Sequence, residues 1–384
     1  MKKSTVSLLG LIAAFALSSA DAQTARPTPG LPQPPALEVS SFVLMEQSTG
    51  AVLASREPDL RVEPASITKI MSAYVVFESM RAGEIRLSEE AVVSENAWRM
   101  QGSRTFLDLN SRVSVENLLL GMIVQSGNDA SVALAEHLAG AEEDFAGIMN
   151  AAAARLGLAG TRYENSTGWP GENHYTTAAD TALLTRAMIR DYPELYAMHA
   201  IREFTWNGIA QPNRNTLLAR DATVDGVKTG HTQSAGYCLV ASAVRDGMRL
   251  IAVVMGASSD AQRSQDALRL LSYGFRYFEN RTLLEAGASL GSARVWKGGD
   301  TVIGLTVPEG VAMTLPKNTA DGAETEVVVN EPLIAPLATD TVIGKVLVTV
   351  NGEVLAQQPL VPERAVSAGS WWQRTRDAVL LWFE

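Results

Sequence analysis

Two β-hairpin patterns, far apart in the chain, enclose a mostly helical stretch. Strand-like residues 41–45 and 51–55 flank Ser48-Thr49-Gly50, and residues 236–244 and 248–256 flank Asp246-Gly247, a strong hairpin turn. A single sheet that pairs the two hairpins, with helices around it, satisfies this arrangement. The pattern therefore predicts an α+β fold.

The stretch between the hairpins has helical periodicity. Ile67, Ile70, Met71, Tyr74 and Val75 follow the i, i+3, i+4, i+7, i+8 spacing of one helix face. Further helices are predicted over 115–124, 130–138, 144–156 and from Thr177, whose spacing to Asp180 resembles a capping box, to Arg190.

After about residue 281 the periodicity changes to short β-like runs. These runs are 301–307, 311–315, 324–329 and 345–350, and Asn351-Gly352 joins the last one to 353–356. The pattern predicts a small all-β domain over residues 281–363, after a first domain over 37–280.

The N-terminus is typical of a secretory signal. Lys2 and Lys3 precede a short apolar run and small residues that end at Ala22, so we expect residues 1–22 to be a signal peptide. Residues 23–36 form a proline-rich lead-in without a packing face.

The C-terminal segment, residues 364–384, is rich in tryptophan. On a helix, the apolar side chains fall near one face and the polar ones largely on the other: Trp371, Trp372, Thr375, Val379, Trp382 and Phe383 against Gln373, Arg374, Arg376 and Asp377. This pattern favours an amphipathic helix that lies on a membrane surface, with a helix docked on the protein's own core as the alternative.

Composition excludes several classes of function. Of 384 residues, 46% are hydrophobic, which excludes whole-chain disorder, and the net charge of −10 makes nucleic-acid binding a poor candidate. Cys238 is the single cysteine, and the four histidines are far apart, so we expect no intramolecular disulfide and no metal site.

The first candidate motif for chemistry is Ser66-Ile-Thr-Lys69. Its serine and lysine are three residues apart, so they share one helix face. The apolar neighbours Ile67, Ile70 and Met71 imply burial of Lys69, which lowers a lysine pKa. A neutral lysine can take the serine proton and make Ser66 a nucleophile without histidine.

Two further polar motifs accompany it. Ser126-Gly127-Asn128 interrupts two apolar helices and can point a hydroxyl and an amide into a cleft, whereas Ser94-Glu95-Asn96 lies in polar surroundings and is discounted. Lys228-Thr229-Gly230 precedes a strand, where the lysine can hold a carboxylate and the glycine lets a substrate backbone approach.

The order and spacing of these motifs form a specific constellation. The sequence resembles the serine-type D-alanyl-D-alanine carboxypeptidases, the low-molecular-mass penicillin-binding proteins of the peptidase S11 family, in residues 61–69, 123–131 and 226–231. The resemblance implies a β-lactamase/transpeptidase-like catalytic domain, then the small all-β domain and the amphipathic helix. It also implies a periplasmic location, with attachment to the inner membrane through residues 367–384.

The resemblance further implies a role for each motif residue. Ser66 would attack the D-Ala-D-Ala bond of a peptidoglycan stem peptide, with Lys69 as general base. Ser126 and Lys228 would relay a proton to the leaving amine, and Asn128 would position the substrate or Lys69. The backbone N–H groups of Ser66 and His231 would hold the oxyanion.

Substrate binding and inhibition follow from the same resemblance. Thr229, within the Lys228–His231 segment, and Arg263 are the candidates for the terminal carboxylate of the substrate. β-Lactams should acylate Ser66, and the chemistry needs no cofactor. Residues 165–169 depart from the family, several members of which carry His-Gly-Leu there.

Three alternatives remain open on the sequence. A serine β-lactamase with the same motifs would need a base for deacylation, for which Glu164 and Glu172 are the only acids in the nearby loop. A D,D-endopeptidase that cleaves cross-links would use the same site. A structural cell-wall-binding protein with a vestigial site is the non-enzyme alternative.

Overall fold

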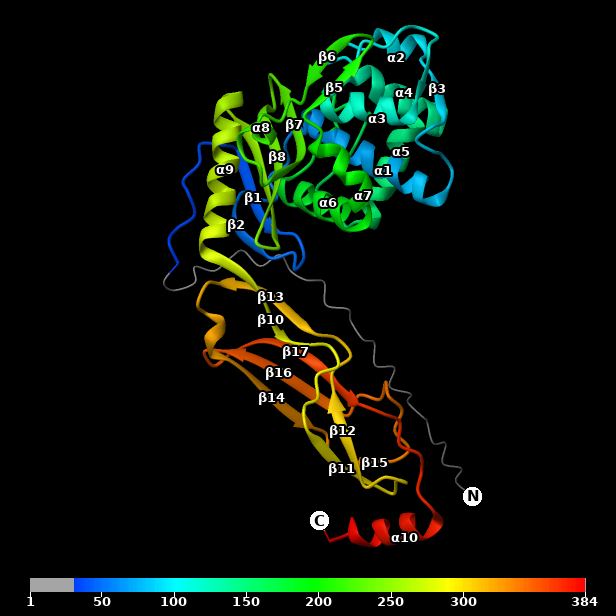
Figure 1. Cartoon of the computed structure of the whole chain (residues 1–384), viewed down its shortest axis with the longest axis vertical. Helices are drawn as coiled ribbons and strands as arrows, with labels where there is room; N and C mark the ends of the chain where they lie inside the picture. The colour runs from blue at the N-terminus through cyan, green and yellow to red at the C-terminus, as the bar shows by residue number, and fades with distance from the viewer. Residues whose placement is uncertain (1–30, 384) are drawn as a thin grey trace, which may run out of the picture.

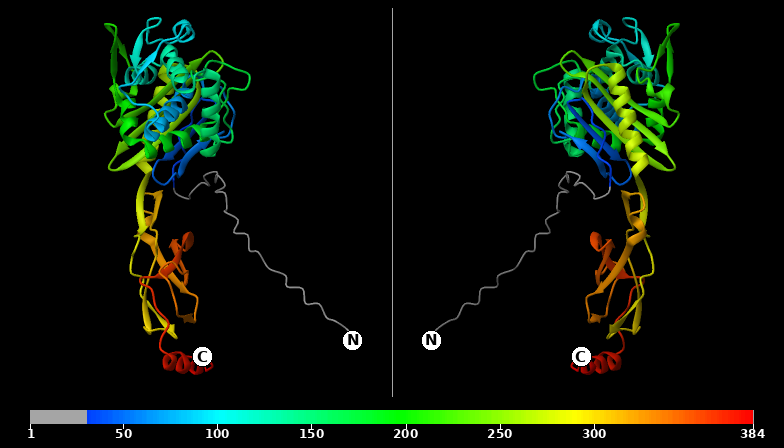
Figure 2. Two further views of the ribbon diagram at one scale, coloured as in Figure 1. Left: turned by 90° about the vertical axis from the view of Figure 1, so that its right-hand side faces the viewer. Right: turned by 90° about the vertical axis from the view of Figure 1, so that its left-hand side faces the viewer.

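The computed structural model of the chain describes residues 31–383, so the predicted signal peptide and most of the predicted lead-in lie outside the described residues. Two domains are stacked end to end in an elongated molecule (Figures 1 and 2). The first mixes helices with one sheet, and the second consists of strands.

The sheet of the first domain has five strands in the order β2-β1-β9-β8-β7. The strands are β1 (Ser41–Glu46), β2 (Val52–Arg56), β7 (Val224–Thr232), β8 (Gly236–Arg245) and β9 (Met248–Ala257). β1 pairs with β9 in antiparallel register, with Val43 opposite Val253, so the two hairpins join as predicted. β7 pairs with β8 and forms one edge of this sheet.

Each face of the sheet packs on its own core because side chains alternate along a strand. Val43, Val240 and Val253 face most of the helices between the hairpins, whereas Leu44, Leu239 and Val254 face α9 (Asp260–Tyr277), and the short helix α8 (Leu217–Arg220) packs on the same side as α9. The helices between the hairpins are α1 (Lys69–Ala82), α2 (Glu95–Arg99), α3 (Val115–Val124), α4 (Asn128–Ala139), α5 (Glu142–Arg155), α6 (Ala178–Asp191), α7 (Pro193–Tyr196) and α8 (Leu217–Arg220).

Short elements complete the helical part. A 3₁₀ turn, η1 (Ala65–Thr68), leads directly into α1, and a second one, η2 (Ala197–Ala200), follows α7. Two small hairpins, β3 (Glu90–Val92) with β4 (Arg112–Ser114) and β5 (Glu203–Trp206) with β6 (Ile209–Pro212), lie apart from the main sheet. The helical periodicity therefore begins with a tighter turn than the sequence predicted.

The second domain is all-β, as predicted, with a separate apolar core that includes Val295, Leu305, Val346 and Leu360. Its strands are β10 (Phe278–Leu284), β11 (Ser292–Trp296), β12 (Val302–Thr306), β13 (Val311–Pro316), β14 (Ala323–Val329), β15 (Leu333–Ile334), β16 (Gly344–Val350) and β17 (Glu353–Pro362), with the turn η3 (Ala320–Gly322) before β14.

A polar junction joins the two domains. Glu46, which is buried at the end of β1, accepts hydrogen bonds from Ser48, Thr49 and Asn280, the last from Nδ2 at 2.8 Å. The hydroxyls of Thr49 and Thr314 lie 2.7 Å apart. These bonds connect the first hairpin of the sheet to β10 and β13, so the first domain is tied to the second by side chains as well as by the chain.

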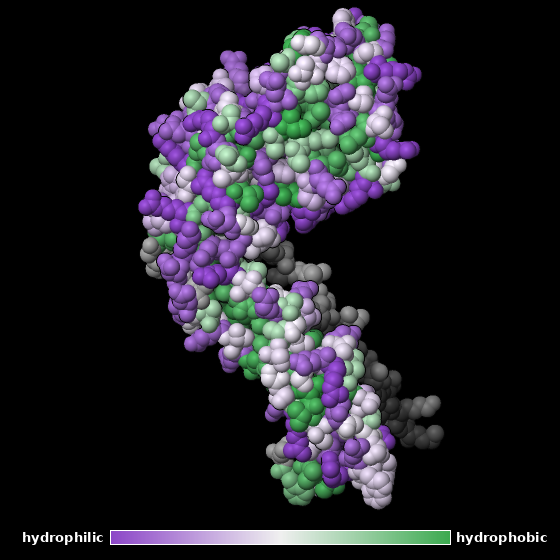
Figure 3. All heavy atoms as spheres, viewed as in Figure 1, coloured by the Kyte–Doolittle hydropathy of each residue, from purple (hydrophilic) through white to green (hydrophobic). Residues whose placement is uncertain are grey.

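The terminal helix α10 (Trp371–Leu380) docks on the second domain through a polar residue. Asp377 is buried, and its Oδ2 accepts a hydrogen bond of 2.7 Å from the backbone N–H of Lys297. Trp372, Trp382 and Phe383 are exposed, and apolar side chains gather at this end of the molecule (Figure 3). Within residues 31–383, no helix is both long enough and apolar enough to cross a bilayer.

Candidate active site

Ser66 and Lys69 meet at the start of α1. The 3₁₀ turn that contains Ser66 aligns side chains three residues apart, so Lys69 Nζ lies 3.2 Å from Ser66 Oγ. Ser66 is partly exposed, whereas Lys69 is only 1% exposed. A hydroxyl that solvent can reach therefore lies beside a buried amine.

Ser126 and Asn128 approach this pair from the break between α3 and α4. Asn128 Oδ1 accepts a hydrogen bond of 2.7 Å from Lys69 Nζ, and Asn128 Nδ2 donates to the carbonyl of Gln101 at 2.6 Å. Ser126 has a positive φ of 67° that interrupts helical geometry, as expected for residues that leave one helix before the next begins.

Lys228 reaches the same place from the edge strand β7. Its Nζ donates hydrogen bonds to Ser126 Oγ at 2.8 Å and to the carbonyl of Thr229 at 3.0 Å. A Cβ atom on Gly230 would lie 3.0 Å from the Pro64 carbonyl oxygen and 3.2 Å from the Ile67 nitrogen. Glycine at this position thus allows β7 to pack directly against the turn that carries Ser66.

Burial controls the charge of both lysines. Desolvation lowers the pKa of Lys69 to about 7, although the carboxylates of Asp129 and Glu142 raise it in part. Desolvation also lowers the pKa of Lys228 well below its usual value, with smaller contributions from the charges of Lys69, Arg214 and Arg263. Near neutral pH, Lys69 is therefore able to accept a proton from Ser66.

A loop over residues 164–169 contributes a backbone atom that the sequence did not indicate. The carbonyl of Thr167 accepts a hydrogen bond of 2.6 Å from Lys69 Nζ. Asn165 fixes the loop, since its Oδ1 accepts from the backbone N–H groups of Gly168 and Trp169 at 2.8 and 3.1 Å. No side-chain pattern can reveal a carbonyl ligand of this kind.

The loop is in turn connected to Glu142, which the sequence analysis also missed. Glu142 Oε1 accepts hydrogen bonds from the N–H and hydroxyl of Ser166. The carboxylate of Asp129 holds a second loop, because its oxygens accept from the N–H groups of Thr105, Phe106 and Leu107 at 2.8 to 3.2 Å. Asp129 follows Asn128 directly, so the polar break between the two apolar helices already indicated a functional position here.

The predicted carboxylate-binding residues have different surroundings. Arg263 is buried on α9, where its Nη1 donates to the Gly230 carbonyl at 3.0 Å and its Nη2 pairs with Asp260. Thr229 is buried at the edge strand beside Lys228, whereas the His231 ring stacks on Tyr237 with ring centroids 3.9 Å apart.

The sequence analysis did not single out Arg214. This residue is exposed, and its positive charge contributes to the lowering of the Lys228 pKa.

Together, these contacts place a nucleophile, a buried amine base and a second amine–hydroxyl pair around one partly exposed serine. A family model described as "D-alanyl-D-alanine carboxypeptidase" matches residues 29–259, and one described as "Penicillin-binding protein 5, C-terminal domain" matches residues 278–368. The chain belongs to the peptidase S11 family of D-alanyl-D-alanine carboxypeptidases.

Relatives match this family assignment over nearly the whole chain. D-alanyl-D-alanine carboxypeptidase DacC of Escherichia coli K12 is 39% identical, over 98% of this chain and 96% of the relative. The structure of penicillin binding protein 5 from Haemophilus influenzae superposes with a TM-score of 0.81 at 40% identity, covering 87% of this chain and 99% of that one. The prediction of a serine-type D-Ala-D-Ala carboxypeptidase, a penicillin-binding hydrolase of the cell wall, is confirmed.

A third similarity concerns the catalytic domain. Penicillin-Binding Protein D2 from Listeria monocytogenes, in its ampicillin-bound form, superposes with a TM-score of 0.58 at 28% identity, over 62% of this chain and 98% of that one. The similarity therefore extends to a penicillin-binding protein in complex with a β-lactam.

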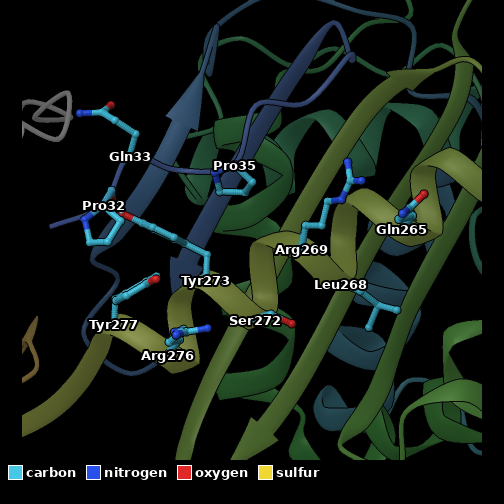
Figure 4. A pocket seen from close by; sticks show the side chains of 10 residues that line it. All are labelled: Pro32, Gln33, Pro35, Gln265, Leu268, Arg269, Ser272, Tyr273, Arg276 and Tyr277. Atoms are coloured by element: carbon cyan, nitrogen blue, oxygen red, sulfur yellow. Dashed lines mark hydrogen bonds between the residues drawn. The ribbon is translucent and has the colours of Figure 1, made fainter.

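A separate hollow of about 520 Å³ lies away from this site (Figure 4). It is formed by the segment around Pro32 and Pro35 and by the outer surface of α9, including Arg269 and Tyr273. Because α9 covers the sheet face opposite to α1, the hollow is not part of the carboxypeptidase site.

Proposed function

We propose that the chain removes the terminal D-alanine from peptidoglycan stem peptides through an acyl-enzyme on Ser66. The observation that carries the proposal is the contact of Ser66 Oγ with Lys69 Nζ at 3.2 Å, combined with the lowering of the Lys69 pKa to about 7 by burial. A base with a pKa near the working pH is suited to general-base catalysis.

The residues in contact give each proton a route. Lys69 takes the proton of Ser66 as Oγ bonds to the carbonyl carbon of the penultimate D-alanine. As the C–N bond breaks, Ser126 donates its proton to the leaving amine and is reprotonated by Lys228, 2.8 Å away. Water then hydrolyses the ester: the proton that the water loses passes through Ser126 to restore Lys228, and the proton held by Lys69 returns to Ser66.

The substrate would be held between the edge strand β7 and the loop that carries Ser126 and Asn128. The backbone N–H groups of Ser66 and His231 would hold the oxyanion. The terminal carboxylate would bind at Thr229 and the exposed guanidinium of Arg214. Arg263 is hydrogen-bonded to the Gly230 carbonyl and would support substrate binding indirectly, by holding β7 in position.

The first test is to replace Ser66 with alanine. Intact-mass spectrometry after mixing with benzylpenicillin should show an adduct on the native protein and none on Ser66→Ala, because the attacking oxygen is missing. Ser94→Ala is the matched control, since Ser94 is the serine of another Ser-x-Asn sequence and caps α2 by accepting from Ala97. Labelling that persists in Ser66→Ala would refute the assignment of the nucleophile.

The time course of the same experiment separates the carboxypeptidase from a β-lactamase. We expect the adduct to persist, because the hydrogen-bond partners of Lys69 Nζ are Ser66, Asn128 and the Thr167 carbonyl, whereas Glu164 and Glu172 are exposed. Rapid drug hydrolysis with little adduct would instead support a β-lactamase. A native protein that shows neither would support the non-enzyme alternative.

We also propose that the chain is exported to the periplasm and is held at the inner membrane by residues 367–384. The polar side of α10 contacts the second domain through the hydrogen bond of Asp377 with Lys297, whereas Trp371, Trp372 and Trp382 are exposed. Tryptophan prefers the interface between lipid and water, so this surface suits a bilayer.

A further inference from the structure

Trp169, the last residue of the loop over residues 164–169, is half-exposed. Its side chain is 47% accessible, an unusual exposure for a large apolar ring beside a catalytic serine. Its position is fixed, since its N–H donates to Asn165 Oδ1 and its carbonyl accepts from Asn165 Nδ2 at 2.9 Å. The ring is therefore attached to a loop whose backbone is held by hydrogen bonds with Asn165.

Two close approaches place this ring at the mouth of the site. Gly168, directly before Trp169, has φ of 87°, and a Cβ there would lie 1.8 Å from the Ala65 carbonyl oxygen and 2.9 Å from the Ser66 nitrogen. A Cβ on Gly102 would lie 2.9 Å from Asn128 Nδ2 and 3.5 Å from Trp169 Cζ3. Gly168 therefore packs on the backbone of the nucleophile, and the indole that follows it lies near Gly102, which also lies against the Asn128 amide.

The position of Trp169 relative to the lysines indicates which half of the substrate it meets. Lys228 and the charge of Arg214 lie on the Ser126 side, where the leaving D-alanine would place its carboxylate. Trp169 lies on the side of Lys69 formed by Asn128 and Thr167. If the leaving D-alanine lies on the Ser126 side, the half of the substrate that remains on Ser66 after bond cleavage would extend toward Trp169.

We propose that Trp169 is a specificity-determining residue whose indole contacts the acyl half of the substrate, on the N-terminal side of the D-Ala-D-Ala unit. The inference rests on the proposed function and deepens it. A flat apolar ring suits the aliphatic part of a peptide side chain or, in a β-lactam, the acyl substituent of the ring amine. The site would thus prefer substrates that carry such a group.

The test compares acylation rates for benzylpenicillin and for aminopenicillanic acid, which lacks the phenylacetyl group. Trp169→Ala and Trp169→Leu should lower the rate with benzylpenicillin by about 3- to 10-fold and leave the rate with aminopenicillanic acid unchanged. Trp169→Phe, which keeps an aromatic face, should stay within about twofold of the native protein. Trp98→Ala is the matched control, because Trp98 is also exposed, at 38%, on the same domain.

The outcomes separate this inference from the proposed function. Equal loss with both compounds would mean that Trp169 only braces the loop, and no loss with either would mean that the ring does not meet the substrate; each result overturns the inference. Absence of any adduct on the native protein would instead overturn the assignment of Ser66.

Discussion

At the scale of single residues, the site depends on a lysine that the fold keeps out of water. Lys69 donates hydrogen bonds to Ser66, Asn128 and the Thr167 carbonyl, and it is almost completely buried. Burial disfavours the ammonium form, whereas the nearby carboxylates of Asp129 and Glu142 favour it. Because burial is the larger of these effects, an amine that is charged in water becomes a usable base near neutral pH.

This balance predicts the pH dependence of acylation. Lys69 must be neutral to accept the Ser66 proton, so the rate should rise with pH through about 7 and fall below it as Lys69 becomes protonated. The measurement is the rate of acylation by benzylpenicillin across about pH 5 to 9. The midpoint belongs to the interacting lysines together, since the charge of Lys69 also acts on Lys228. A rate that is flat through neutral pH would contradict the role of Lys69.

At the scale of elements, the site is assembled by segments that the sequence analysis treated separately. The spacing of Ser66 and Lys69 predicted their contact, and the apolar runs on either side of Ser126 predicted the break that presents Asn128. The sequence analysis placed Lys228 before a strand, whereas Lys228 lies within the edge strand β7 and contacts Ser126 from there. The hairpin patterns predicted the four other strands of the sheet. These features were predictable because each depends on local periodicity or turn chemistry.

Other features depend on contacts between distant segments and left no local pattern. The Thr167 carbonyl and the charge of Arg214 reach the lysines only after the chain has folded. The amphipathic pattern of the tail was predicted, but the burial of Asp377 was not, because its partner is the backbone of Lys297, 80 residues earlier. A helical wheel places polar residues in solvent unless such a partner is known.

The loop held by Asp129 gives a prediction at this scale. Asp129→Asn would replace an acceptor oxygen with an N–H₂ group that faces backbone donors, because both carboxylate oxygens accept from the loop over residues 105–107. We expect a loss of about 1 to 3 kcal/mol in the free energy of unfolding, measured by urea denaturation. Asp144→Asn, at an exposed position in the first turn of α5, should change it by no more than about 0.5 kcal/mol. Equal stability of the two variants would contradict this account.

At the scale of the whole molecule, the second domain separates the catalytic site from α10. Figure 1 places α1 and α10 in the two opposite parts of the elongated molecule. The junction around Glu46 and Asn280 ties the first domain to β10, and the Asp377 contact ties α10 to the second domain. Each end of the all-β domain is therefore held by side-chain hydrogen bonds.

Removal of the C-terminal segment tests the membrane proposal. A chain that lacks residues 367–384 should no longer bind vesicles of anionic and zwitterionic lipids, since it lacks Trp371, Trp372, Trp382 and Phe383, all of which are exposed. Vesicle sedimentation measures the bound fraction, and benzylpenicillin labelling of the truncated chain verifies that the catalytic domain is intact. Sedimentation equal to that of the full chain would refute the proposed anchor.

The hydrogen-bonded junction has a mechanical consequence for an enzyme that works on a fixed polymer. With α10 on a bilayer, the all-β domain becomes a spacer, and the Glu46–Asn280 and Thr49–Thr314 contacts limit how far the catalytic domain tilts on it. Ser66 would then be accessible only to peptidoglycan within a narrow range of distances from the bilayer surface. Stem peptides in that layer would be trimmed first. The length of the all-β domain would therefore select substrates by their distance from the membrane as well as by their chemistry.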